Sequence, residues 1–312
     1  MSQDHLPPVR PFLGSEYPQT PPEQALFQII PAPFEATVSY GGGTAAGPEA
    51  ILAASDQLER YDGTSCPGDG GIHTWPEVDC RGTPREVLPR IGQAIGEALG
   101  AHGDRPVPVL LGGEHSITAP AVAAVADHLR HTTGEEFPLG VIQIDAHADL
   151  RQEYEGSTLS HASVMRRIHQ DLGIPVIQLG VRALCTEEAD YRKMKAGPSL
   201  TWYDGADLVP PGASPFPFPR FPFPENFPHR VYLTLDVDGL DPSLCPATGT
   251  PVPGGLGWYQ TLDLLGWICA QRELIAFDLV ELAPIPGFHA ADYAAAELVY
   301  RIMGMISRSR TT

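Results

Sequence analysis

The sequence predicts an α/β fold in which helices cover both faces of a mainly parallel sheet. Short apolar runs alternate with amphipathic stretches over residues 107–305, and polar clusters follow directly after three of the apolar runs. Such alternation is typical of a parallel sheet that is buried on both faces. With 312 residues, 43% of them hydrophobic, the chain is long enough for one large domain with a sizeable core. We therefore expect a single three-layer α/β/α domain.

The first part of the chain is expected to hold a surface strap and two helices. Residues 1–35 are rich in proline and contain the apolar run 26–30 near their end, which predicts a strap over the surface, with the domain proper spanning 36–312. After the glycine turn YGGGTAAG, a proline stands where a helix begins, so residues 47–61 are expected to be helical. Residues 83–99 form the second expected helix, because their apolar side chains recur about every four positions.

Short apolar runs and the amphipathic stretches between them supply the rest of the fold. The expected elements are the strands 107–111, 139–144, 176–180, 231–235 and 274–279 and the helices 119–130, 163–172, 186–196 and 290–305. In a sheet of this kind the ligand site lies beyond the carboxyl ends of the strands. The residues that follow each strand are therefore the candidates for function.

A segment rich in proline and phenylalanine interrupts this pattern at about residues 205–229. Its centre, residues 215–224, reads PFPFPRFPFP. Prolines at every second position prevent a helix and favour an extended, polyproline-like chain. We interpret the segment as a rigid surface strap. An oligomer contact or the rim of a pocket is the alternative, because exposed phenylalanines are costly.

The charge of the chain restricts its partners. Asp and Glu number 38 against 20 Lys and Arg, which gives a formal net charge of -18. This balance argues against a nucleic-acid partner, which needs a basic surface, and is compatible with a cationic substrate. No apolar run approaches the roughly 20 residues that span a bilayer, and residues 1–10 lack the layout of a signal peptide. The five cysteines are scattered, which indicates reduced thiols, so we expect a cytoplasmic protein without a membrane partner.

Polar residues follow three of the expected strands. Side chains on an extended chain alternate between two faces, so residues two apart point the same way. Carboxylates that converge on one edge of a sheet repel each other unless a cation lies among them. Taken singly, the acids could be turn or capping residues and the first histidine a loop residue. Together they predict a metal site formed by His115, Asp145, His147, Asp149, Asp236 and Asp238.

The number and type of these side chains indicate which metal they bind. One divalent ion needs about four to six ligands, whereas six side chains with bridging carboxylates suit two ions roughly 3.5–4 Å apart. Oxygen-rich ligation with two imidazoles and no thiolate fits manganese better than structural zinc. We expect two Mn²⁺ ions, with nickel, cobalt and iron as alternatives.

Several motifs resemble the ureohydrolase family of arginases and agmatinases. They are GGEHSIT (112–118), DAHADL (145–150), SHAS (160–163), LDVDGLDPS (235–243) and DLVELAP (278–284). The resemblance is collinear from about residue 34 to residue 305. Residues 37–51, 154–167 and 179–188 look like the agmatinase branch in particular. The resemblance implies an arginase-like fold and a hydrolase of guanidino compounds.

The resemblance also implies a role for each ligand. The two manganese ions would share Asp145 and Asp236, the more exposed ion would also take His115 and Asp149, and the second would also take His147 and Asp238. In the family, a hydroxide held between the ions attacks the guanidinium carbon, and the resulting intermediate collapses to urea and an amine.

Two further residues match the family's catalytic groups. Glu281 matches the acid that pairs with the guanidinium, a geometry that carboxylates suit well. Without the motif it would be interpreted as a helix-start or surface acid. His161 matches the histidine that carries a proton to the departing amine, a task suited to imidazole. Alone it would be interpreted as a surface residue or a neighbour of a helix cap.

The loop 150–160 bears on the choice of substrate. It has no asparagine, carries Glu153 and Glu155, and offers Arg151 as its only base. Because acids suit a distal ammonium, agmatine, cleaved to putrescine and urea in polyamine biosynthesis, is the first expectation. Aminopropylagmatine fits nearly as well, whereas guanidinobutyrate and arginine, which carry carboxylates, rank lower. Glu155 is the candidate partner of the ammonium, with a solvated loop acid as the alternative.

Two interpretations from other functional classes fit the sequence less well. A non-catalytic family member that regulates or assembles with a partner would normally have lost one of the ligands, and this chain retains the full set with His161 and Glu281. A metal-dependent deacylase on a related fold has no support in the motifs. The resemblance also implies a homo-oligomer, either a trimer or a hexamer.

Overall fold

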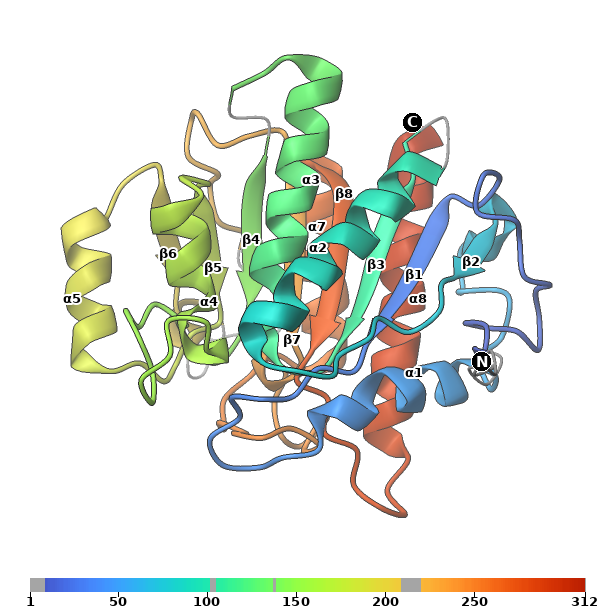
Figure 1. Cartoon of the computed structure of the whole chain (residues 1–312), viewed down its shortest axis with the longest axis horizontal. Coiled ribbons are helices and arrows are strands. Elements are labelled where there is room, and N and C mark those ends of the chain that lie inside the picture. Colours follow the sequence, from blue (N-terminus) through green and yellow to red (C-terminus); the bar gives the residue numbers. More distant parts are fainter. Residues whose placement is uncertain (1–8, 102–104, 137–138, 209–219, 312) are drawn as a thin grey trace, which may run out of the picture.

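The computed structural model describes residues 9–101, 105–136, 139–208 and 220–311 of the chain. Its centre is a sheet of eight strands in the order β2-β1-β3-β8-β7-β4-β5-β6, with every neighbouring pair parallel (Figure 1). The strands are β1 (Phe27–Ala32), β2 (Ile72–Thr74), β3 (Val107–Gly112), β4 (Gly140–Ile144), β5 (Val176–Leu179), β6 (Leu200–Tyr203), β7 (Arg230–Asp236) and β8 (Glu273–Val280). The sheet that the sequence predicted as mainly parallel is parallel throughout these strands.

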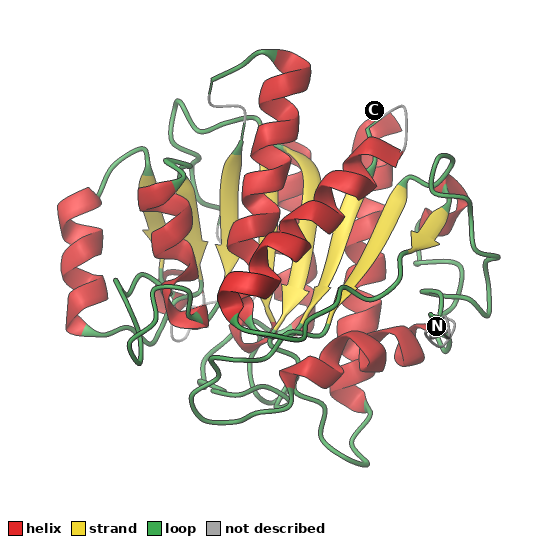
Figure 2. Cartoon of the chain, in the orientation of Figure 1, coloured by secondary structure: helices red, strands yellow, loops and turns green. Residues whose placement is uncertain are grey.

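Helices cover both faces of the sheet, which confirms the three-layer α/β/α fold (Figure 2). Helices α2 and α3 pack on one face, and α1, α7 and α8 pack on the other. The helices are α1 (Gly47–Ser55), α2 (Pro84–Ala101), α3 (Thr118–Thr133), α4 (Val164–Arg166), α5 (Thr186–Lys195), α6 (Gly205–Leu208), α7 (Trp258–Gln271) and α8 (Ala290–Thr311). The sequence predicted α1 to continue to residue 61, but it ends at Ser55.

The amino-terminal segment joins the fold more closely than a surface strap would. Phe12 and Leu13 are fully buried, and their backbone N–H groups donate to the hydroxyls of Thr74 and Ser55. Residues 27–32, which were expected to belong to the strap, form β1 between β2 and β3. The domain therefore includes β1, because all six residues of this strand are buried in the sheet.

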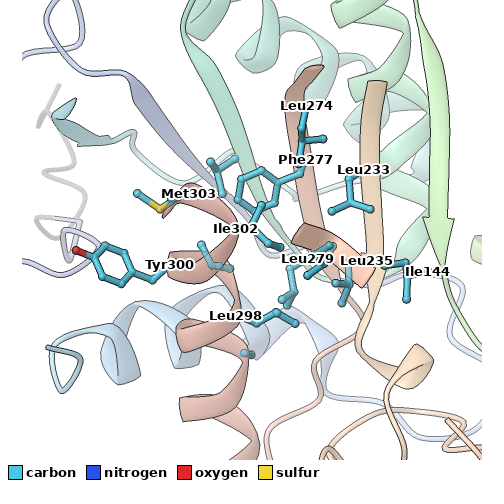
Figure 3. Close-up of a cluster of buried hydrophobic side chains, with 14 of the residues drawn as sticks. Ile144, Leu233, Leu235, Leu274, Phe277, Leu279, Leu298, Tyr300, Ile302 and Met303 are labelled. Atoms are coloured by element: carbon cyan, nitrogen blue, oxygen red, sulfur yellow. The ribbon is translucent and has the colours of Figure 1, made fainter. Parts of the chain in front are cut away.

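The core beside β7 and β8 anchors the strands that carry the candidate metal ligands. Leu233, Phe277 and Leu279 of the sheet pack against Leu298 and Ile302 of α8 (Figure 3), and all five are buried. Burying a side chain of this size contributes about 1.5–3 kcal/mol. This packing holds the carboxyl ends of the two strands in fixed positions.

The described part of the proline- and phenylalanine-rich segment packs on helix α7 and on strand β4. Residues 209–219 lie outside the described residues, so only 220–224 of the PFPFPRFPFP stretch can be placed. Phe221 and Phe223 pack on Trp267 of α7, with ring centroids 4.5 and 5.0 Å apart. Phe227 is buried against Gly140, at the amino end of β4. These phenylalanines thus add to the core. Phe221 also packs on Tyr203 at the carboxyl end of β6, with ring centroids 4.7 Å apart, whereas Phe227 lies at the amino end of β4.

Among the described residues, no helix combines the length and the hydropathy needed to cross a membrane. The five cysteines are unpaired.

Candidate metal centre

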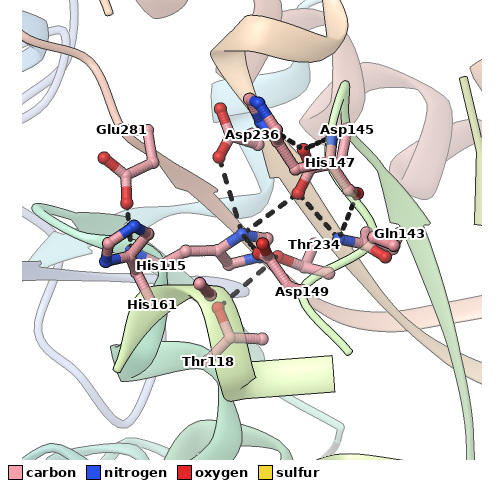
Figure 4. A network of polar contacts seen from close by, with 12 residues as sticks. His115, Thr118, Gln143, Asp145, His147, Asp149, His161, Thr234, Asp236 and Glu281 are labelled. Atoms are coloured by element: carbon pink, nitrogen blue, oxygen red, sulfur yellow. Dashed lines mark hydrogen bonds and ion pairs between the residues drawn. The ribbon is translucent and has the colours of Figure 1, made fainter. Parts of the chain in front are cut away.

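Four neighbouring strands end at the edge of the sheet where the polar residues gather. In the order β3-β8-β7-β4, their carboxyl ends lead to His115, Glu281, Asp236 and Asp145. Figure 4 shows these side chains with His147, Asp149 and His161 in one network. The carboxyl ends of adjacent parallel strands form the crevice in which such folds bind ligands.

His115 lies at the centre of the first cluster. Its Nδ1 atom is 2.9 Å from Asp149 Oδ2, 3.2 Å from Asp145 Oδ2 and 3.5 Å from Asp236 Oδ2. The imidazole is 1% exposed, yet this Nδ1 has no partner in hydrogen-bonding geometry within the described residues. A buried polar atom that faces three carboxylates without a hydrogen bond is the arrangement expected of a metal ligand.

The opposite nitrogen of His115 is held by a hydroxyl. Nε2 lies 2.8 Å from Thr234 Oγ1, and Thr234 Oγ1 lies 3.4 Å from the hydroxyl of Thr118, which donates to the buried carboxylate of Asp278. Because the Thr118 proton is donated to Asp278, Thr234 can donate to Thr118 and accept from Nε2, which would leave the Nδ1 lone pair for a metal ion. Such outer contacts commonly fix the tautomer of a metal-binding histidine.

The second cluster shares Asp145 with the first. His147 Nδ1 lies 2.9 Å from Asp238 Oδ2 and 3.7 Å from Asp145 Oδ1. One ligand atom each from His115, Asp145 and Asp149, and likewise from Asp145, His147 and Asp238, lies within 4.8 Å of the others in its group. Backbone N–H groups hold the acids in place, because Asp236 accepts from Asp238 N and Asp238 accepts from Ala146 N. Two adjacent clusters with a shared carboxylate fit a pair of divalent ions.

The metal-free cluster is electrostatically strained. Burial and the neighbouring carboxylates raise the pKa of Asp145 to about 7 and the pKa of Asp236 well above its usual value. Burial disfavours the charged form of His147, but its hydrogen bond to Asp238 and the nearby acids outweigh burial and raise its pKa to about 10. Protons therefore replace part of the positive charge that divalent ions would supply.

Two of the acids stand in a backbone conformation that L-residues rarely adopt. Asp149 has φ 52° and Glu281 has φ 64°, both in the left-handed region. Each such residue costs on the order of 1–3 kcal/mol, and such strain concentrates at functional sites. The strained turns direct both carboxylates toward the cluster.

Glu281 and His161 flank the cluster on the side of the cavity. The Glu281 carboxylate accepts the backbone N–H of His115 at 2.6 Å, and burial raises the pKa of Glu281 to about 8. His161 begins a short 3₁₀ helix after Ser160 and packs edge-on against the ring of Tyr154, with centroids 5.9 Å apart. The structure thus brings both predicted catalytic residues to the metal cluster.

The cavity above the cluster has a volume of about 370 Å³. Among its lining residues are His115, His147, Asp149, Arg151, Tyr154, His161, Glu188, Asp236, Asp238 and Glu281. Glu155 is exposed and does not line this cavity, so the structure does not bring the predicted ammonium partner to the site. The backbone of Glu155 has a left-handed conformation, with φ 50°. The preceding residue, Tyr154, lines the cavity.

Glu188 is a residue of the site that the sequence prediction missed. It is buried, lines the cavity and accepts the N–H groups of Leu150 and Cys185 at 3.0 and 2.8 Å. The bond to Leu150 fixes the chain next to Asp149. The sequence contains a signal for this residue, since Glu188 stands at the third position of α5, where an acid typically caps the helix start.

Comparisons with known proteins agree with this geometry. The arginase family model matches residues 25–304. The N(1)-aminopropylagmatine ureohydrolase of Synechocystis is 38% identical over 290 residues, covering 90% of this chain and 89% of that protein. A protein of that name from Thermus thermophilus is 36% identical over 297 residues, covering 92% of each chain. The agmatinase of Pyrococcus horikoshii is 30% identical, covering 94% and 96%. The solved structure of the agmatine ureohydrolase of Thermoplasma volcanium has a TM-score of 0.78 and 24% identity, covering 97% and 96%, and shows the shared fold.

Proposed function

The chain belongs to the arginase family, and on that premise we propose that it releases urea from a guanidino polyamine with the help of two divalent metal ions. The observation that carries the proposal is the pair of His and Asp clusters that share Asp145 on the wall of the cavity. The overall reaction adds water to the guanidino carbon and breaks one carbon–nitrogen bond, which yields urea and an amine.

The donor set fits a binuclear centre. His115 and Asp149 would hold one ion and His147 and Asp238 the other, with Asp145 and Asp236 between them. When bound, two divalent ions lower the pKa of a water molecule and supply a nucleophile near neutral pH. Two imidazoles and four carboxylates favour manganese among the common ions, with nickel, cobalt and iron as alternatives.

Two other residues of the cavity bind the guanidinium and carry a proton to the departing amine. The Glu281 carboxylate, buried beside the cluster, is placed to accept N–H groups of the planar guanidinium, a pairing that is strong and directional. His161 lines the same cavity and is placed to protonate the departing amine. The amine leaves poorly unless it gains a proton as the carbon–nitrogen bond breaks.

The length of the substrate is inferred from the relatives. Two proteins at 38% and 36% identity are named N(1)-aminopropylagmatine ureohydrolases, so we infer that N(1)-aminopropylagmatine is the preferred substrate. Agmatine, which the sequence placed first, is the second candidate, because the Pyrococcus horikoshii agmatinase is 30% identical. Both are polycations, and the cavity wall offers the acid Glu188 for a second ammonium, together with one arginine, Arg151.

A urea-release assay tests the proposal. The purified protein is loaded with Mn²⁺ and offered N(1)-aminopropylagmatine, agmatine, guanidinobutyrate, arginine and guanidine. We expect the highest kcat/KM with N(1)-aminopropylagmatine and a measurable value with agmatine. Urea release at an intact rate from fully metal-stripped protein, or from Asp149→Ala, would refute the metal-dependent mechanism. Higher kcat/KM for guanidinobutyrate or arginine would refute the choice of substrate class alone.

Three further features stay predictions. They are a cytoplasmic location, a role in polyamine biosynthesis and a homo-oligomer. Size-exclusion chromatography with light scattering would distinguish a trimer from a hexamer.

A further inference from the structure

A partly buried chain of hydrogen bonds runs from Glu114 through Thr37 to His161. We propose that Thr37 and Glu114 are positioning residues that hold His161 in the tautomer with its proton on Nδ1, so that Nε2 presents a lone pair to the cavity. The inference deepens the proposed function, because His161 is the proton carrier of that reaction. Neither Thr37 nor Glu114 belongs to the metal cluster.

Glu114 is the anchor of this chain. Its side chain is fully buried, and its carboxylate accepts the backbone N–H groups of Ala36 and Thr37 at 2.5 and 2.6 Å. It also accepts the hydroxyls of Thr37 and Ser116, at 2.9 and 2.5 Å. Both oxygens of this carboxylate thus act as acceptors, and the two hydroxyls beside it point their protons toward it.

The direction of the Thr37 hydroxyl proton determines which hydrogen bond Thr37 can make with the imidazole of His161. Its only hydroxyl proton is donated to Glu114, which leaves two lone pairs. One accepts the backbone N–H of His161 at 3.0 Å, and the other lies 3.1 Å from Nδ1 of the same residue. A hydroxyl that has already donated can only accept at Nδ1, so the Thr37 contact favours the tautomer with the proton on Nδ1. Ser160 Oγ is a weaker second neighbour, 3.4 Å from Nδ1.

The fold brings these distant residues together by joining the ends of β1 and β3. The backbone N–H groups of Gly113 and Glu114 donate to the carbonyls of Ala32 and Phe34. Gly113 lies so close to the Phe34 carbonyl that a Cβ atom would overlap it, which requires glycine there. The segment after β1 is therefore fixed beside the segment after β3, and Thr37 reaches the start of the His161 helix.

This arrangement has a chemical consequence. Nε2 makes no hydrogen bond to another described residue, and the side chain lines the cavity. With the Nε2 lone pair toward the cavity, His161 begins the cycle as a proton acceptor. It gains one proton from the attacking water and gives it to the departing amine nitrogen, so the residue ends as it began. The Glu114 carboxylate, reached through the polarised Thr37 hydroxyl, stabilises the intervening imidazolium.

Two substitutions and one control test the proposal on the full-length, metal-loaded protein. Thr37→Val removes the hydroxyl and keeps the shape, whereas Thr37→Ser keeps the hydroxyl. Thr261→Val removes a buried hydroxyl in α7, which donates to Gly257 O and is not among the residues that line the cavity. We expect Thr37→Val to lower kcat by about 10- to 100-fold, as part of the roughly 10²–10⁴-fold contribution of acid–base catalysis, with KM within about twofold. Thr37→Ser should restore kcat to within about threefold, and Thr261→Val should leave it unchanged.

The tautomer itself is measured independently of activity. Long-range ¹⁵N–¹H NMR on protein labelled in histidine and loaded with diamagnetic Zn²⁺ distinguishes a protonated ring nitrogen from a bare one, and His161→Asn assigns the signal. We expect a protonated Nδ1 and a bare Nε2 in the parent protein, and a gain of the Nε2–H form in Thr37→Val. The reverse tautomer in the parent, or an unchanged tautomer in Thr37→Val, would overturn the proposal. A parent protein with the expected tautomer but no urea release would instead overturn the proposed function.

Discussion

The amino ends of the strands (the amino edge of the sheet) and their carboxyl ends (the carboxyl edge) differ in how the charges of their acids are compensated. At the amino edge, acids meet arginines in half-exposed ion pairs, such as Arg105 with Glu273 at 3.1 Å and Arg230 with Glu135 at 3.0 Å. At the carboxyl edge, the acids are buried, and near them lie the imidazoles of His115 and His147 and the guanidinium of Arg182, which donates to a backbone carbonyl. Exposed pairs contribute little, whereas uncompensated buried carboxylates are costly. The comparison teaches that the carboxyl edge is built for cations that the chain does not itself contain.

The largest expected effect comes from removing one charge at the carboxyl edge. Asp236→Asn keeps an oxygen that can accept the Asp238 N–H but deletes a carboxylate whose pKa is raised by burial and by Asp238, Asp145 and Glu281. We expect loss of urea release, measured by steady-state assay. The metal-free variant should nevertheless melt a few degrees higher at pH 8, since about 1 kcal/mol corresponds to roughly 2–4 °C in large domains.

The sign of this stability change follows from the direction of the pKa shift. A carboxyl whose folded pKa lies above its unfolded value destabilises the fold as pH rises through the interval between the two values. For Asp236 this interval begins at the ordinary pKa of an aspartate, 3.8. The gain in melting temperature should therefore vanish below about pH 4. A metal-free variant that melts lower than the parent at pH 8 would contradict the electrostatic strain.

The second effect tests which acid of the site binds the guanidinium. Glu281→Gln keeps an acceptor for His115 N–H but removes the charge. We expect kcat/KM to fall by about 10²–10³-fold, the usual loss when one charged contact to the reacting group is removed. Glu155→Gln is the matched control, since Glu155 also has a positive φ but is exposed and absent from the cavity wall. A tenfold loss in that control would reinstate Glu155 as a substrate ligand.

The third effect is the pH dependence of metal binding. In the metal-free protein the pKa of His147 is raised to about 10 and the pKa of Asp145 to about 7, so both hold protons at or below neutral pH. Metal ions must displace these protons, and affinity should rise about tenfold per pH unit for each proton released. Competition with a chelating dye between about pH 6.5 and 8.5 measures the slope. An affinity independent of pH would mean that the ligands are already deprotonated.

The smallest effect is expected at the amino edge. Glu273→Gln removes ion pairs with Arg105 and Arg230, at 3.1 and 3.7 Å. Because these pairs are partly exposed, the free energy of unfolding, measured by denaturant titration, should fall by only about 0.2–1 kcal/mol. Urea release should stay at the parent rate. A loss of activity here would show that the two edges are coupled.

The local hydrophobic pattern explains which strands and helices could be predicted from the sequence. The strands β3, β4, β5, β7 and β8 are short apolar runs, and hydrophobic pattern alone identified them. The strand β1 was not predicted, because its run FQIIPA contains a proline and follows a proline-rich stretch. β6 has only four residues, three of them half-exposed, and α7 begins after a glycine-rich loop without a strong helix-start signal. The strands β1 and β6 form because they pair with strands that are distant in the sequence, and a local pattern does not show such pairing.

The site shows the same limit. The six candidate metal ligands could be predicted because each follows an apolar run and two of the clusters carry a regular spacing. Thr37 and Glu188 could not, because the partners that give them a role stand 77 and 38 residues away, at Glu114 and Leu150. Glu155 was misplaced because the composition of a loop does not say which way its backbone turns. Contacts between loops need the fold before they can be seen.

The most direct test of the binuclear site counts metal ions against activity. The protein is stripped with a chelator, dialysed, and titrated with Mn²⁺ while bound metal and urea release from N(1)-aminopropylagmatine are measured on the same samples. Two ions per chain should bind, and the rate should reach its plateau when both are bound. Full activity in the stripped protein, or a plateau at one ion per chain, would contradict the shared role of Asp145 and Asp236 at the carboxyl edge.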